Sequence, residues 1–188
     1  MAKHTDYLKK MVDILYDSTI SNKNNEKLDW EYGFEEVVQM FADTKEKDGH
    51  LFFVGNGGSA AIAEHMTADF IKNGRMKTVS IVGNALTTCM SNDYGYEYAF
   101  SNPLEMLMKE GDMLVAISSS GNSKSIVNAI NVAREKRSSV VTLSGFRKDN
   151  VISSMGDMNI YVPIEHYGIV ESIHNLLLQQ VVDELMEK

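Results

Sequence analysis

The stretch Leu51-Phe-Phe-Val-Gly-Asn-Gly-Gly-Ser59 decides the fold of this chain, and a second stretch of the same kind, Met113-Leu-Val-Ala-Ile-Ser-Ser-Ser-Gly-Asn-Ser123, follows it. Each begins with a short apolar run bounded by turn residues, which is typical of a buried strand. A Gly/Ser loop and a helical pattern come next. A strand, a glycine-rich turn and a helix in this order bring free backbone N–H groups and a helix N-terminus to one point, which suits an anion.

The composition of the two loops indicates which kind of anion they would bind. Glycine lets the backbone approach a ligand closely, and serine adds hydroxyl donors. Neither loop carries the lysine of a P-loop, so the pair indicates a small phosphorylated ligand rather than a nucleoside triphosphate. A single loop of this kind is equally typical of an ordinary strand-to-helix turn. The recurrence of Gly-Asn and Ser in both loops favours a binding site.

Strand and helix patterns alternate from residue 50 onward. Strands are expected at 50–54, 77–82, 112–117, 139–143 and 158–162. Helices are expected at 59–72, 85–91, 101–109, 123–135, 149–154 and 167–187. Such alternation implies parallel strands joined by right-handed crossovers, hence an α/β fold with a three-layer, doubly wound sheet of five parallel strands. Both Gly/Ser loops follow the carboxyl ends of strands, where such sheets bind ligands near the topological switch point.

The segment from about residue 1 to 47 is expected to form a helical extension. Tyr7, Met11 and Leu15 recur at helical spacing, and a second helix is expected from about 28 to 47. The polar run Ser21-Asn-Lys-Asn-Asn25 separates the two. Because this segment is too short for a second domain, residues 1–188 are interpreted as one domain whose extension packs on the core or on another subunit.

Composition excludes several classes of protein. The chain has 188 residues and a formal net charge of −8, which argues against direct nucleic-acid binding. No apolar run approaches the roughly 18 residues of a membrane span, so no membrane partner is expected. The single Cys89 excludes an intramolecular disulfide and a cysteine-based zinc cluster. A reducing cytoplasm is the simplest location for such a chain.

With these features the chain resembles the SIS (sugar isomerase) domain family, in particular its phosphoheptose isomerase branch. The two loops look like that domain's signature loops, and Ser91-Asn-Asp-Tyr-Gly-Tyr96 resembles the branch's Asn-Asp loop. The resemblance covers essentially the whole chain. It implies a flavodoxin-like fold, a homo-oligomer that is a tetramer, and heptose biosynthesis. The implied reaction is aldose–ketose isomerisation of sedoheptulose 7-phosphate to D-glycero-D-manno-heptose 7-phosphate through an enediol.

The resemblance also assigns a substrate site. The residues that would hold the sugar phosphate are Asn56, Gly57, Ser59, Ser118, Ser119, Ser120 and Ser123. The residues that would line the sugar are Asn92 and Asp93, for which a turn with an Asx cap is the alternative.

Two helices carry the candidate chemistry. His65 and Asp69 are four residues apart and share one helical face. The family has His and Glu there as metal ligands, with the Glu also proposed as the base. On its C-terminal helix the family has Gln and His eight residues apart, and the matching positions here are Glu171 and Gln179. The metal set implied by the resemblance is therefore His65, Asp69, Glu171 and Gln179.

This set departs from the family because one imidazole is missing. The resemblance implies one divalent metal, zinc in the family, but an oxygen-rich set suits zinc less well than a set with two imidazoles. His174, three residues after Glu171, is a possible replacement. Isomerisation needs a base to remove a proton beside a carbonyl and an acid to return one. Glu171 or Asp69 is the candidate base and His65 or His174 the candidate acid.

Each of these residues also has a structural alternative. His65 and Asp69 would be a hydrogen-bonded pair on a helix surface, and Glu171 and His174 an ordinary helix pair. Gln179 would have a purely structural or solvated role. The chain would then be a non-catalytic SIS-domain binding protein, of the replication-initiator-associating type, or a sugar-phosphate sensor. The retained cluster of His65, Asp69 and Glu171 favours an enzyme, since a scaffold needs no such cluster.

Overall fold

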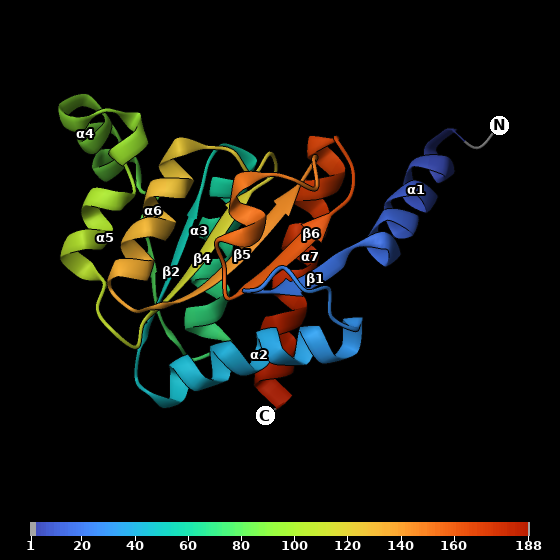
Figure 1. Cartoon of the computed structure of the whole chain (residues 1–188), viewed down its shortest axis with the longest axis horizontal. Helices are drawn as coiled ribbons and strands as arrows, with labels where there is room; N and C mark the ends of the chain where they lie inside the picture. Colours follow the sequence, from blue (N-terminus) through green and yellow to red (C-terminus); the bar gives the residue numbers. More distant parts are fainter. Residues whose placement is uncertain (1–2, 188) are drawn as a thin grey trace.

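The computed structural model describes residues 3–187, apart from the side chain of Asn84. It contains one six-stranded sheet with the order β1-β6-β5-β4-β2-β3 (Figure 1). The strands are β1 (Thr19–Asn22), β2 (His50–Gly55), β3 (Lys77–Ser80), β4 (Met113–Ser118), β5 (Ser139–Gly145) and β6 (Met158–Val162). All neighbouring pairs are parallel except β1 with β6, which is antiparallel. The expected five parallel strands are confirmed, and β1 adds a sixth.

The strand order fixes the place of the ligand site. The chain moves from β2 outward to β3 and then returns to place β4 on the other side of β2. This is the flavodoxin-like order with its switch point between β2 and β4. The first Gly/Ser loop leaves β2 at Gly55, the second leaves β4 at Ser118, and these strands are direct neighbours. The two loops therefore open side by side at the switch point.

Helices cover both faces of the sheet. On one face α6 (Lys124–Glu135) packs on β4 and β5, and α5 (Ser101–Leu107) packs on α6. On the other face α3 (Gly58–Lys72) packs on β2 and on α7 (Tyr167–Glu187), which α2 (Trp30–Glu46) also contacts. Figure 1 shows α6 in front of the sheet and α7 behind it. The expected three layers are thus present.

Apolar strands fill the middle layer. Every residue of β4 is buried, as expected for a strand covered on both faces. Between the sheet and its covering helices, the ring of Phe70 lies 5.0 Å from that of Phe41 and 5.4 Å from that of Phe53, measured between centroids. This aromatic cluster joins α2, β2 and the last turn of α3, so it fixes the C-terminal end of α3 relative to the sheet.

The N-terminal segment differs in part from the expected pair of helices. The helix α1 (Lys3–Asp17) and α2 are present, but β1 occupies Thr19–Asn22 where a break was expected. Asn22 then closes a turn by accepting the backbone N–H groups of Asn24 and Glu26. Such a short polar strand shows no apolar alternation. It exists because β6 supplies its hydrogen-bond partners, which sequence patterns do not reveal.

Smaller differences concern three short helices. The expected 85–91 helix extends over α4 (Asn84–Tyr94), and a 3₁₀ turn, η1 (Tyr96–Tyr98), follows it. The expected 149–154 helix is a 3₁₀ turn, η2 (Val151–Ser154). No helix between residues 3 and 187 combines the length and apolar character that a membrane span requires.

Candidate functional site

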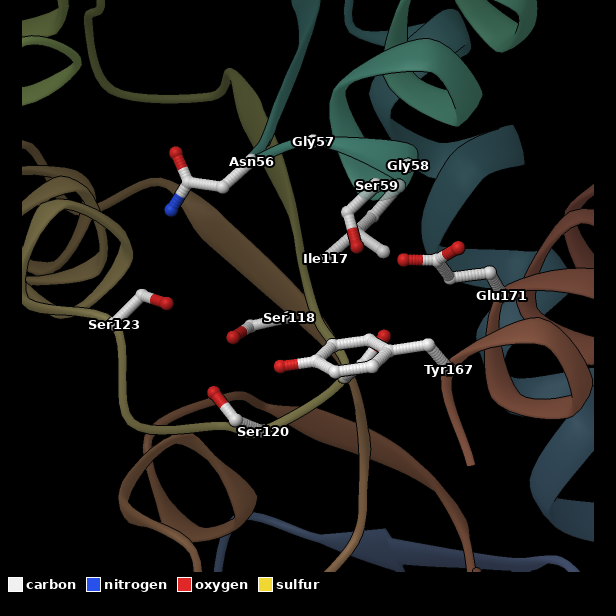
Figure 2. Close-up of a pocket in the computed structure, with 11 residues that line it drawn as sticks. Asn56, Gly57, Gly58, Ser59, Ile117, Ser118, Ser120, Ser123, Tyr167 and Glu171 are labelled. Carbon is white, nitrogen blue, oxygen red and sulfur yellow. The ribbon is translucent and has the colours of Figure 1, made fainter. Parts of the chain in front are cut away.

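A cavity of about 280 Å³ lies where β2 and β4 end, as the sequence predicts (Figure 2). It is lined by Asn56, Gly57, Gly58, Ser59, Ile117, Ser118, Ser119, Ser120, Ser123, Tyr167 and Glu171. Both Gly/Ser loops and the first turns of α7 contribute to it. Seven of the residues that the resemblance assigns to the sugar phosphate are therefore gathered in one place.

The first loop presents the N-terminus of α3 to the cavity. Gly57 is the N-cap of α3 and has a φ of +56°, a left-handed conformation that glycine adopts without strain. No side chain caps the helix there. An uncapped N-terminus carries partial positive charge on its first N–H groups, so this end of the cavity suits an anion.

The second loop supplies hydroxyl groups. The Ser118 hydroxyl accepts the backbone N–H of Gly121 at 3.2 Å, which folds the loop back on itself. Ser123 is the N-cap of α6, and its hydroxyl makes no capping hydrogen bond. The hydroxyl of Ser119 is buried without a hydrogen-bond partner among the described residues. Because a buried hydroxyl without a partner costs free energy, an incoming acceptor at this loop would be stabilised.

Asn56 lines the cavity but its side chain is already engaged. Its amide oxygen accepts the Tyr96 hydroxyl at 2.6 Å, and its amide nitrogen donates to the Ser125 hydroxyl at 3.1 Å. Figure 2 shows this side chain directed away from Glu171. The amide therefore ties the first loop to η1 and α6, and its contribution to a ligand would come from the backbone.

Glu171 alone carries a carboxylate among the described residues that line the cavity. Its carboxylate packs against the backbone of Gly58, the first residue of α3, and a Cβ at Gly58 would collide with it. Burial raises the pKa of this carboxyl above its ordinary value. A carboxylate with a raised pKa at a ligand cavity has the properties of a general base.

The sequence interpretation missed Tyr167. This residue begins α7 and lines the cavity, and its ring packs edge-on against Phe146 with centroids 4.8 Å apart. Its spacing of four residues before Glu171 was a usable signal, because residues so spaced share a helical face.

His65 and Asp69 form the expected pair, yet they do not line the cavity. The His65 Nε2 atom lies 3.4 Å from the Asp69 Oδ2 atom, with side-chain exposures of 56% and 21%. They lie two and three turns along α3 from Gly58.

The two residues further along α7 lie apart from the cavity too. Gln179 lines a separate groove between α7 and α1, together with Met11 and Leu15. His174 is fully buried, with its Nε2 atom 3.1 Å from the Ser144 carbonyl oxygen. Burial lowers the pKa of His174 to about 4, against a smaller opposing effect of that hydrogen bond. A neutral, enclosed imidazole is poorly suited to donate a proton to a ligand near neutral pH.

The metal set does not fit a metal ion within this chain. Among residues 3–187, no group of three or more His, Cys, Asp or Glu side chains is placed to hold one. His65 and Asp69 form a pair, Glu171 packs on Gly58, and Gln179 lines another groove.

Asn92 and Asp93 lie in the last turn of α4 rather than in a loop, and both are exposed. The Asn92 amide donates to the Asp93 carboxylate at 2.9 Å. Neither lines the cavity.

The fold and the cavity together define a domain of the sugar isomerase type, and comparison supports this, since residues 6–145 match the SIS domain family. The phosphoheptose isomerase of Proteus mirabilis is 34% identical over 165 residues, which cover 82% of this chain and 84% of that protein. The chain belongs to the phosphoheptose isomerase family.

Solved structures agree with this assignment. Phosphoheptose isomerase GmhA from Neisseria gonorrhoeae matches with a TM-score of 0.77 and 30% identity, covering 82% of this chain and 85% of that one. A phosphoheptose isomerase from Francisella tularensis matches with a TM-score of 0.85 and 22% identity, covering 99% and 97%. The second likeness concerns the fold and extends it to the helical N-terminus.

Proposed function

We propose that this chain is an aldose–ketose isomerase that converts sedoheptulose 7-phosphate to D-glycero-D-manno-heptose 7-phosphate. Membership of the phosphoheptose isomerase family supports the reaction. The observation that carries the proposal is the single cavity in which serine hydroxyls and a helix N-terminus face one carboxylate, Glu171. An anion site and a base are the two parts that isomerisation of a sugar phosphate requires.

The serine loops would anchor the phosphate. Ser118, Ser119, Ser120 and Ser123 lie on one side of the cavity, at the N-terminus of α6, and Ser59 lies at the start of α3. Hydroxyl and backbone N–H donors at the N-terminus of α6 suit a phosphate dianion, whereas the start of α3 lies beside Glu171. Anchoring the phosphate, which is on C7 of the sugar, leaves the reacting carbons C1 and C2 at the other end of the ligand.

Glu171 would be the base at that other end. Its carboxylate takes a proton from C1 of the ketose, so that the C1–C2 double bond forms and the negative charge moves to O2. The O1 hydroxyl proton then passes to O2, and Glu171 returns its proton to C2 as the C1–O1 double bond forms, which gives the aldose. The raised pKa of Glu171 brings its basicity closer to that of the carbon acid, which favours proton transfer.

His65 and Asp69 stay candidates for acid–base work through the family resemblance alone. Turnover of an Asp69→Asn variant decides this. A loss as large as that of Glu171→Gln adds the pair to the site, whereas unchanged turnover leaves it as a surface pair.

We also propose a homo-oligomer, a tetramer as the resemblance implies, in the cytoplasm. The helix α1 has no buried residue and exposes Tyr7, Leu8, Val12 and Tyr16 by 43%, 57%, 46% and 85% (Figure 1). Leu8, Val12 and Tyr16 recur every four residues along one exposed face, and a second copy of the chain would cover it. Light scattering should show an oligomer at micromolar concentration, and a monomer would contradict this proposal.

Conversion of sedoheptulose 7-phosphate by the purified protein tests the function. We expect the aldose phosphate to accumulate to equilibrium, as measured by NMR. Binding of the sugar phosphate without conversion would instead support the sugar-phosphate sensor. Absence of both would support a protein-binding module.

A further inference from the structure

Tyr167 is a second polar group that reaches the cavity from α7. It lies four residues before Glu171, one helical turn away, so both side chains project from the same face of the helix. Figure 2 shows the ring lying across the cavity with its hydroxyl directed toward Ser118 and Ser120, while the Glu171 carboxylate faces Gly58. The side chains of Tyr167 and Glu171 thus lie at opposite ends of the cavity.

The position of the Tyr167 ring is fixed by its neighbour Phe146. That ring packs edge-on against Tyr167 at 4.8 Å. Phe146 has a φ of +56°, which is strained for a residue with a side chain. Two hydrogen bonds hold this conformation, since the Phe146 carbonyl accepts the Tyr161 hydroxyl at 2.7 Å and its N–H donates to Ile164 at 3.3 Å. Backbone strain of this kind is retained where surrounding structure enforces it, and it is common at ligand sites.

The start of α7 is also packed closely against the second loop. Gly145, at the end of β5, lies between Val170 of α7 and the Ser119 carbonyl, and a Cβ there would clash with Val170 and press closely on the carbonyl oxygen. This contact holds the first turn of α7 beside the serine loop. The Tyr167 hydroxyl makes no hydrogen bond with any residue between 3 and 187, so it is available to a ligand.

We propose that Tyr167 is a substrate-binding residue that donates a hydrogen bond to the phosphate of the sugar phosphate and closes the cavity over it. This inference rests on the proposed function, because it takes a phosphate as the charged end of the ligand. The distance between Tyr167 and Glu171 then selects the length of the substrate. One turn of α7 sets the separation between the anchored phosphate and the base, so a seven-carbon chain reaches Glu171 better than a five-carbon chain.

The test uses Tyr167→Phe and Tyr167→Ala, with Tyr32→Phe as the matched control. Tyr32 is an exposed tyrosine on α2 that does not line the cavity. Tyr167 is itself 61% exposed, so neither of its variants removes a buried side chain. The affinity for inorganic phosphate is measured by calorimetry, and kcat and KM are measured with sedoheptulose 7-phosphate and ribulose 5-phosphate.

We expect Tyr167→Phe to weaken phosphate binding by about tenfold to a hundredfold, the scale of one hydrogen bond to a charged group. The KM for the heptose phosphate should rise while kcat changes little, because binding at C7 is the same in the ground state and the transition state. Tyr167→Ala should also lower the preference for the seven-carbon over the five-carbon substrate. Tyr32→Phe should leave every value unchanged.

An unchanged phosphate affinity in Tyr167→Phe would overturn the inference, and so would a fall in kcat with KM unchanged. The phosphate measurement does not depend on turnover. If the unmodified protein fails to convert sedoheptulose 7-phosphate but Tyr167→Phe still loses phosphate affinity, the proposed reaction fails and the role of Tyr167 in phosphate binding stands.

Discussion

The serine loops differ from the candidate residues on α3 and α7 in how far the nearby sequence determines their positions. The loops follow adjacent parallel strands, so a short motif in each places its serines in one cavity. The candidate residues on α3 and α7 are spread over helices several turns long. Glu171 reaches the cavity, His65 and Asp69 pair outside it, and His174 is buried. Motif spacing therefore predicts an anion site well, whereas helix packing decides which residues can do chemistry.

Replacement of Glu171 should have the largest effect, and it tests whether catalysis and phosphate binding depend on separate regions. Glu171→Gln should lower turnover by roughly 10²–10⁴, the range for a lost base, while the affinity for the sugar phosphate stays close to that of the unmodified protein. Steady-state kinetics and calorimetry measure the two quantities. Asp183→Asn, an exposed carboxylate at the far end of α7, is the matched control. A parallel loss of affinity would show that the two regions are not separable.

The same variant has a predicted effect on stability. Because burial raises the folded-state pKa of Glu171, stability that is present below its unfolded pKa is lost as the pH rises through the folded pKa. Glu171→Gln removes this penalty, so its Tm at neutral pH should equal or exceed that of the unmodified protein. A lower Tm would mean that the carboxylate has a stabilising partner.

His174 should affect stability rather than turnover. Its folded pKa of about 4 is depressed from the ordinary 6.5, so the neutral imidazole stabilises the fold above pH 6.5 and this contribution is lost as the pH falls toward 4. The loss is on the order of 3 kcal/mol. The free energy of unfolding, measured by denaturation at pH values from 7 to 4, should therefore fall less with decreasing pH for His174→Gln than for the unmodified protein. Equal pH dependence would mean that His174 is not a buried neutral group.

Gly58→Ala displaces Glu171 without changing it. The added methyl group would occupy the place of the Glu171 carboxylate, a flexible end that can move away. We expect turnover to fall about 10²-fold, the scale reported for a misplaced catalytic group, with little loss of stability. At the control position, Gly83→Ala, the methyl group enters open space and turnover should not change. Full activity of Gly58→Ala would remove Glu171 from the mechanism.

Loss of the serine hydroxyls should have the smallest effect. Replacement of Ser118 and Ser120 together by Ala should weaken sugar-phosphate binding by about 1–3 kcal/mol, the scale of lost hydrogen bonds to a charged group. Ser154→Ala, an exposed serine outside the cavity, is the control. Unchanged affinity by calorimetry would show that the loops do not bind the phosphate.

The sequence predicted the central parallel strands β2, β4 and β5 because each is a short apolar run that is buried on both faces. It did not predict β1, whose polar residues pair only because β6 lies beside them. The family resemblance singled out Glu171 as a candidate, and Glu171 lines the cavity. The sequence did not predict Tyr167, whose position depends on Phe146 at the end of a different strand, or the burial of His174 against Ser144. Contacts between distant elements have no local signature, and these residues depend on such contacts.

The central claim is that Glu171 transfers a proton at the end of a sugar whose phosphate is held by the serine loops. Proton NMR of sedoheptulose 7-phosphate with the protein in D₂O tests it most directly. A partly exposed carboxylate exchanges its proton with solvent, so deuterium should appear at C1 of the ketose and C2 of the aldose, and Glu171→Gln should abolish this. Interconversion to equilibrium with no deuterium at either carbon would contradict the claim.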